Sequence, residues 1–169
     1  MARANTKIGD VFSVKVDENS EKYFQYIISD LTQLNSDVIR SFKKKYPIDA
    51  NPDLLEIVES EVEFYAHCVT ILGIKMGFWE KVGNINIVGD TSQILFRDTN
   101  DYGHKVGEEP IRVSKKWYVW HVNDRDFTRV GELVGDYRKA EIGLVMNPQR
   151  IVDRIKTGDY GFTAYPAYE

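Results

Sequence analysis

The chain has 169 residues, of which 43% are hydrophobic and 28% are charged. These proportions are typical of a folded protein and the length suits one domain, so the sequence predicts a single domain over residues 1–169 with a flexible N-terminus at residues 1–6. The formal net charge of −4 argues against a nucleic-acid partner, because neutralising phosphate groups requires clustered Lys and Arg side chains.

Cys68 is the only cysteine, which excludes an internal disulfide. No apolar stretch approaches the roughly 20 residues that span a bilayer, and the first six residues lack the hydrophobic core of a signal peptide. We therefore expect a cytoplasmic protein without a membrane partner.

The first predicted elements form a β-hairpin. Gly9 and Asp10 favour a turn, and β-branched and aromatic residues dominate the run that follows, Val11–Val16. A polar connector over residues 17–20 separates this run from a second one of the same kind, Lys22–Ser29. The two runs have strand length and are close enough in sequence to pair.

The middle of the chain predicts a third strand, a helix and a fourth strand. Basic residues interrupt the alternation of Val38–Lys44, which indicates an edge strand or a bent strand. Asn51 and Pro52 mark a helix near residues 52–60, with Asn as the N-cap and Pro at the first helical position. The apolar-rich run Val62–Leu72 then predicts one long, largely buried strand.

The second half of the chain predicts more strands and a final helix. The predicted strands are Ile94–Phe96, Lys116–Val122, Phe127–Leu133 and Ala140–Val145. A helix over residues 148–157 has Asn147 as its N-cap, Pro148 at the first position and Gly158 as the C′ glycine. Together the elements predict an α+β fold, mostly antiparallel β, arranged as a sheet or a partly open barrel with two short helices.

The sequence contains no strong catalytic or metal-binding motif. The three histidines, His67, His104 and His121, lack the tight ligand spacing of zinc sites. His67 and Cys68 are adjacent in a predicted strand, so their side chains point to opposite faces, and the apolar neighbours of Cys68 predict a core position. We therefore expect no catalytic residue, no cofactor and no metal.

The richest polar segment is the predicted loop Arg97–Pro110. Long ordered loops are often functional, and this one mixes acids with an aromatic residue in a composition that suits protein recognition. The strand after it carries a tryptophan that is a candidate binding anchor if its face is exposed. The predicted partner-binding residues are Asp98, Asp101, Tyr102, Glu108, Glu109 and Trp117.

Two segments of the opening hairpin, Lys7-Ile8-Gly9-Asp10-Val11-Phe12 and Lys22-Tyr23-Phe24-Gln25-Tyr26, resemble the immunity protein 26 family of bacterial polymorphic-toxin systems. Gly77-Phe78-Trp79 and Ile151-Val152-Asp153-Arg154-Ile155 are similar to that family as well. The resemblance implies a mostly β fold and a protein that neutralises the product of a neighbouring toxin gene by direct binding. It implies no catalytic residue.

From this resemblance we expect a cytosolic, non-enzymatic immunity protein that occludes its cognate toxin domain. One alternative is a small hydrolase, acting for example on phosphoesters, with Asp98, Asp101 and His104 at its centre. The other alternative is an interaction module unrelated to toxins. The sequence sets no oligomeric state.

Overall fold

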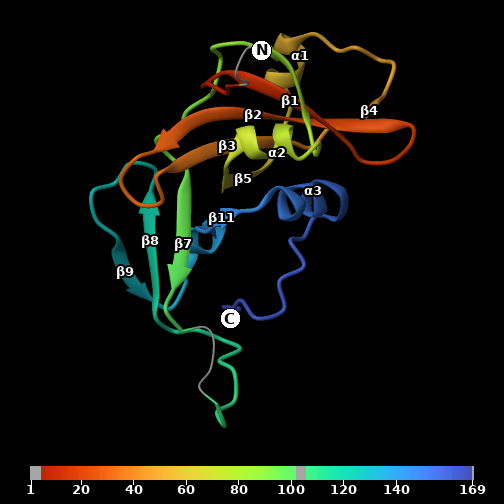
Figure 1. Ribbon diagram of the computed structural model, residues 1–169. Coiled ribbons are helices and arrows are strands. Elements are labelled where there is room, and N and C mark those ends of the chain that lie inside the picture. Colours follow the sequence, from red (N-terminus) through yellow and green to blue (C-terminus); the bar gives the residue numbers. More distant parts are fainter. Residues whose placement is uncertain (1–4, 102–105, 169) are drawn as a thin grey trace.

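The computed structural model describes residues 5–101 and 106–168, which form two β-sheets and three α-helices (Figure 1). Sheet A has the strand order β11-β5-β3-β2-β1-β6, with β4 paired to β2. Its strands are β1 (Asp10–Lys15), β2 (Ser20–Asp30), β3 (Ser36–Phe42), β4 (Tyr46–Pro47), β5 (Val62–Cys68), β6 (Glu80–Asn84) and β11 (Val145–Met146).

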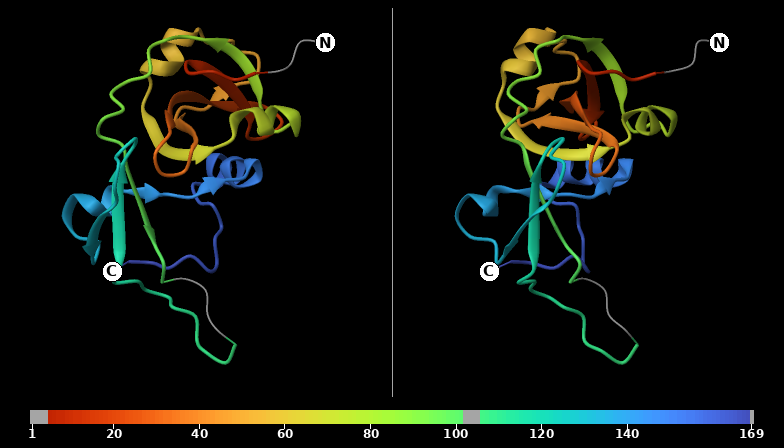
Figure 2. Two further views of the ribbon diagram at one scale, coloured as in Figure 1. Left: turned by 60° about the vertical axis from the view of Figure 1, so that its left-hand side comes forward. Right: turned by 90° about the vertical axis from the view of Figure 1, so that its left-hand side faces the viewer.

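Sheet B has the order β10-β7-β8-β9 and projects away from sheet A (Figures 1 and 2). Its strands are β7 (Leu95–Thr99), β8 (Trp117–His121), β9 (Thr128–Gly131) and β10 (Glu141–Ile142). Both sheets are open, and the only parallel pairs among the described strands are β10 with β7 and β11 with β5. The predicted α+β class with mostly antiparallel strands is confirmed, in its sheet form rather than as a barrel.

The faces of sheet A are covered by different elements because side chains alternate along its strands. On one face, Phe24 and Ile39 pack against Ile151 and Ile155 of α3 (Pro148–Thr157). The other face is covered at one end by α1 (Leu54–Glu59). At its other end, the same face packs against residues of sheet B, which places a shared apolar cluster at the junction of the two sheets.

The opening hairpin forms as predicted. β1 and β2 pair antiparallel, from Val11 opposite Gln25 to Lys15 opposite Glu21. Gly9 has a φ of 97°, and a Cβ atom there would lie 2.9 Å from the carbonyl oxygen of Ile85. Glycine is therefore needed where the chain enters the sheet beside β6.

Of the two alternatives for Val38–Lys44, the edge strand is wrong, because β3 ends at Phe42 and lies inside sheet A between β2 and β5, with a register shift against β5 between Ser41 and Phe42. Arg40, one of the basic residues that interrupt the alternation, is buried. The Arg40 guanidinium donates to Gln25 Oε1 and to the Ile87 carbonyl, each at 3.0 Å. Internal hydrogen bonds thus allow a charged side chain in a central strand.

The first predicted helix begins later than expected. Asn51 has a φ of 45° and precedes the helix, while the carboxylate of Asp53 caps α1 by accepting from the Glu56 backbone N–H at 2.8 Å. Asn51 is therefore not the N-cap. Asn tolerates the left-handed conformation, and the Asp side chain that follows Pro52 is the better placed acceptor.

The predicted long strand Val62–Leu72 is wrong beyond Cys68, where β5 ends and α2 (Thr70–Lys75) begins. Asp37 of β3 accepts from the backbone N–H of Thr70 at 2.9 Å and from its hydroxyl at 2.6 Å. This contact from a distant strand supplies the N-terminal cap that the local sequence lacks. A Cβ atom at Gly73 would lie 1.9 Å from the ring of Trp79, so α2 packs closely on that indole.

The predicted strand Ala140–Val145 is divided between the two sheets. After the 3-10 turn η1 (Gly135–Lys139), β10 pairs with β7 of sheet B, and two residues later β11 pairs with β5 of sheet A. Gly143 lies at the crossing, where a Cβ atom would come within 2.0 Å of the Trp120 ring. The chain passes between the sheets at a point where only glycine fits.

The other predicted elements of the second half are found, with shifted ends. Residues 94–96 fall at the start of β7, residues 116–122 on β8 and residues 127–133 on β9. The final helix is confirmed with its caps: Asn147 accepts from the Arg150 N–H at 3.0 Å, and Gly158 has a φ of 85°. None of the helices in the described ranges has the length and apolar composition needed to cross a bilayer.

Of the N-terminal segment predicted to be flexible, residues 1–4 lie outside the described residues. Thr6 belongs to the structure, and its hydroxyl lies 2.6 Å from that of Thr70 at the start of α2. This contact holds the end of the segment against the start of α2.

Candidate functional site

The segment predicted to contact a partner lies between β7 and β8, and its described residues 106–113 extend beyond both sheets (Figures 1 and 2). Its base is held by hydrogen bonds. The hydroxyls of Thr99 and Ser114 lie 2.8 Å apart, and Ser114 also donates to Asp101 at 3.2 Å. The C-terminal tail completes the anchor, since Ala167 exchanges backbone hydrogen bonds with Arg112 and Ser114 at 2.8 and 3.0 Å.

Two of the predicted contact residues lie inside this base. Asp98 is 8% exposed and accepts from the Thr99 N–H at 2.8 Å and from the Tyr165 hydroxyl at 3.0 Å. Burial raises the pKa of Asp98, although these hydrogen bonds oppose the shift. Asp98 is therefore not available to contact a partner, because its carboxylate is buried and already accepts these two hydrogen bonds.

Trp117 is likewise not available to contact a partner, because the residue is only 1% exposed. Its indole Nε1 donates to the Ser114 carbonyl at 2.9 Å. The rings of Tyr165 and Tyr168, from the C-terminal tail, lie 6.0 and 6.4 Å from the Trp117 ring. The tail thus covers a strand face that the sequence analysis left open to a partner.

The outer part of the segment is exposed. Glu108 and Glu109 are exposed, and Asp101 is partly buried at the base. Val106 is fully exposed and Ile111 is exposed as well, which the sequence analysis did not single out. Tyr102, predicted to bind a partner, lies outside the described residues.

The cluster predicted for a hydrolase is only partly described. His104 lies outside the described residues, while Asp98 and Asp101 both accept hydrogen bonds that fasten the base of the segment. Within residues 5–101 and 106–168, no group of three His, Cys, Asp or Glu side chains is placed to hold a metal ion.

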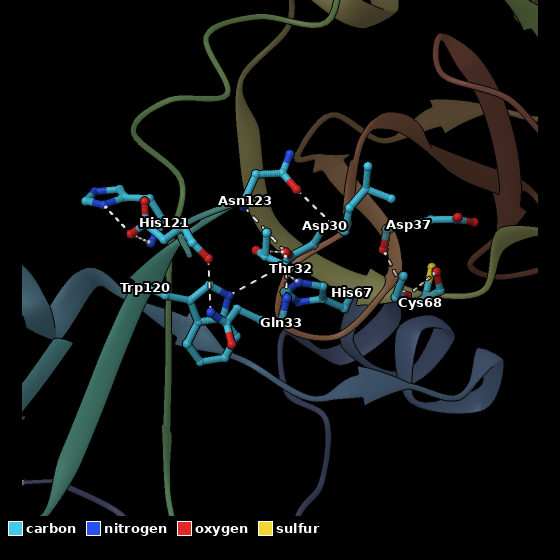
Figure 3. A network of polar contacts seen from close by, with 12 residues as sticks. Asp30, Thr32, Gln33, Asp37, His67, Cys68, Trp120, His121 and Asn123 are labelled. Atoms are coloured by element: carbon cyan, nitrogen blue, oxygen red, sulfur yellow. Dashed lines mark hydrogen bonds and ion pairs between the residues drawn. The ribbon is translucent and has the colours of Figure 1, made fainter. Parts of the chain in front are cut away.

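The strongest polar cluster lies elsewhere, at the junction of the sheets, and was missed from the sequence. Asp30, at the end of β2, has no exposed surface (Figure 3). Its Oδ2 lies 2.8 Å from His67 Nε2 of β5 and accepts from Trp120 Nε1 of β8 at 3.1 Å. Its Oδ1 accepts from the Thr32 hydroxyl at 3.3 Å and from the Asn123 N–H at 3.4 Å.

Electrostatics favour a charged carboxylate at this junction. Burial alone would raise the pKa of Asp30, but hydrogen bonds from His67 and Trp120 outweigh it and hold the pKa far below its ordinary value. The Nδ1 atom of His67 is buried and has no hydrogen-bond partner within the described part of the chain. The indole, imidazole and carboxylate form a closed contact between the two sheets.

This arrangement joins elements rather than meeting a substrate. The side chains of Asp30 and His67 are fully buried. The neighbouring Cys68 packs on the opposite face of β5, in the core, as predicted, and burial raises the pKa of its thiol. The local sequence does not mark this junction, because the partners of Asp30 on β5 and β8, His67 and Trp120, are 37 and 90 residues away in sequence.

Comparison with protein families, with curated proteins and with solved structures finds no match for this chain. Fold and site together define an α+β protein with two open sheets and one projecting segment between β7 and β8.

Proposed function

We propose that this chain is a cytoplasmic immunity protein that neutralises a toxin domain by binding it directly and covering its active site. The observation that carries the proposal is the segment of residues 106–113, which extends beyond both sheets (Figure 2). The resemblance of the opening hairpin and the last helix to immunity protein 26 supports the same function.

The chemistry of the segment suits binding to a protein. Val106 and Ile111 expose apolar surface at a distance from the core, where a partner pocket can bury them. Glu108 and Glu109 lie between them and favour a partner with a basic rim. Exposed acids of this kind accelerate encounter more than they tighten the final complex.

The fixed base of the segment also favours binding. Hydrogen bonds among Thr99, Asp101 and Ser114 connect the end of β7 to the chain before β8, and the backbone pairing of Ala167 with Arg112 and Ser114 holds the end of the segment that leads to β8. A segment that is anchored before binding loses less conformational entropy on association.

The proposal requires a toxin domain encoded beside this gene, and the test is co-expression with that domain, followed by kinetic measurement of the complex. We expect wild-type protein to restore growth and to copurify with the toxin domain. Glu108→Gln/Glu109→Gln should slow association by roughly three- to tenfold at low salt and much less at high salt. Val106→Ser/Ile111→Ser should raise Kd by about tenfold or more through lost apolar burial.

Glu132→Gln is the matched control, because Glu132 is an exposed carboxylate outside the segment, and it should leave both constants unchanged. A neighbouring toxin that is neither bound nor neutralised contradicts the proposed function. Unchanged constants in both double variants would place the contact elsewhere on the molecule.

A further inference from the structure

A second candidate binding site lies along one edge of β5, where strand pairing is incomplete. On one side β3 pairs along the strand, from Cys68 back to Val62. On the other side β11 pairs only with His67 and Cys68. The chain before β11 forms β10, which lies close to β5 but pairs with β7 of sheet B, so no described strand is hydrogen-bonded to this side of β5 from Val62 to Ala66.

A groove of about 690 Å³ runs along this uncovered edge. Four consecutive residues of β5, Val62 to Tyr65, line it. Because successive side chains of a strand point to opposite faces, a groove that meets all four follows the edge of the strand and not one face. Four residues span about 13 Å, the length of a short extended peptide.

The far wall of the groove comes from sheet B and from η1. Leu95 contributes apolar surface in front of the buried Ile94, and Tyr137 contributes an exposed ring. The edge of β5 offers backbone groups, while the far wall offers apolar and aromatic contacts. This combination is that of sites that bind an extended peptide by strand addition.

Three carboxylates line the groove, Glu63, Asp136 and Glu141, against the single ammonium of Lys139. Both carboxylate oxygens of Glu141 accept hydrogen bonds from the two terminal guanidinium nitrogens of Arg154. Glu63 contacts Lys22 through Oε2 alone, and the pair between Asp136 and Lys139 is exposed at both ends, 93% and 81%. Such an exposed pair contributes little and exchanges easily.

We propose that this groove binds an extended, basic peptide segment of a partner protein as an added strand beside Val62–Ala66 of β5. Alternate side chains of the peptide enter the apolar wall at Leu95, and Lys or Arg side chains contact the free oxygens of Glu63 and Asp136. The charge of these two carboxylates selects the basic partner. The site is separate from the projecting segment and does not rest on the function proposed for it.

The probe is a displayed library of random ten-residue peptides, selected on the full chain, with one enriched peptide then synthesised. We expect enriched sequences to alternate apolar and polar residues and to contain Lys or Arg. Hydrogen exchange of the complex should show slower exchange of the amides of residues 62–66. Glu63→Gln/Asp136→Asn should raise the Kd of the synthetic peptide by at least tenfold.

Glu18→Gln/Asp126→Asn removes two exposed carboxylates outside the groove and should change the Kd less than twofold. Val106→Ser/Ile111→Ser should bind the peptide as wild type, which separates this site from the projecting segment. Three results each overturn the proposal: no enrichment, slowed exchange only outside residues 62–66, or a dimer in sedimentation whose own 62–66 amides are slowed without peptide. The last result would assign the groove to a second copy of this chain.

Discussion

The carboxylate of Asp30 gathers hydrogen bonds from three parts of the chain in a fully buried position. One oxygen contacts His67 and Trp120, and the other contacts the turn after β8 through the Asn123 N–H. A buried charge of this kind is stable only when its lone pairs are satisfied, so each partner of Asp30 depends on the others. The residue is therefore a structural centre that no single element contains.

Asp30→Asn should lower the free energy of unfolding at pH 7 by about 2–4 kcal/mol, because the amide donates where His67 or Trp120 also donates. The folded-state pKa of Asp30 lies below its unfolded value of about 3.9, so the native state binds fewer protons than the unfolded state in acid. Its stabilisation is fully present above about pH 4 and is lost as the pH falls towards the lowered folded pKa. Urea unfolding between pH 7 and pH 3 measures this slope.

In Asp30→Asn, the free energy of unfolding should no longer show the part of its pH dependence that arises from Asp30. Asp126→Asn, at an exposed site, should keep the wild-type stability and slope. Equal slopes in Asp30→Asn and in wild type would show that Asp30 is not the group that titrates.

Among the helices, α3 has the most complete terminal signals. The side chain of Asn147 accepts from the Arg150 N–H, and the Gly158 N–H donates to the Arg154 carbonyl at 2.7 Å. Asn147→Ala should destabilise the protein by about 1 kcal/mol, since it leaves a helix N–H without its acceptor. Asn147→Ser is the control, because a hydroxyl caps equally well and should restore most of the loss. Thermal and urea unfolding measure both, and equal losses would argue against capping as the cause.

The contrast between α3 and α2 explains how far elements could be predicted. The signals of α3 lie within its own sequence, and the pairing of β1 with β2 follows from one short connector. The cap of α2 is Asp37, whose position beside Thr70 exists only after β3 and β5 have paired. Periodicity in Val62–Leu72 contains no trace of that contact, so the run resembled a longer strand.

The residues of the candidate site could likewise be predicted only where their surroundings depend on nearby sequence and not on the fold of the whole molecule. Glu108 and Glu109 were predicted to contact a partner and are exposed, whereas Asp98 of the same predicted loop is buried at its base. Trp117 could not be placed, because alternation in β8 says nothing about which face the C-terminal tail covers. The junction centred on Asp30 depends on β2, β5 and β8 meeting, which is a property of the whole fold.

The two sheets are joined by both polar and apolar contacts. Ile27 and Val38 of sheet A share an apolar cluster with Phe96 and Trp120 of sheet B. Around the cluster, the Leu31 N–H donates to the Asn123 side chain at 2.8 Å. Contacts of this density predict that the sheets unfold together and not as independent units.

Trp120→Ala should uncouple the sheets, because it removes the central ring of the shared cluster and the indole donor to Asp30. In wild type, native-state hydrogen exchange should give amides of β2 and β8 the same free energy of opening. In the variant, we expect a loss of about 3–5 kcal/mol, with β8 opening at a lower free energy than β2. Phe127→Ala is the control, since this exposed ring touches Trp120 from outside and should cost much less. If β8 already opens far more easily than β2 in wild type, the shared cluster does not couple the sheets, and sheet B is held by its own core around Trp117.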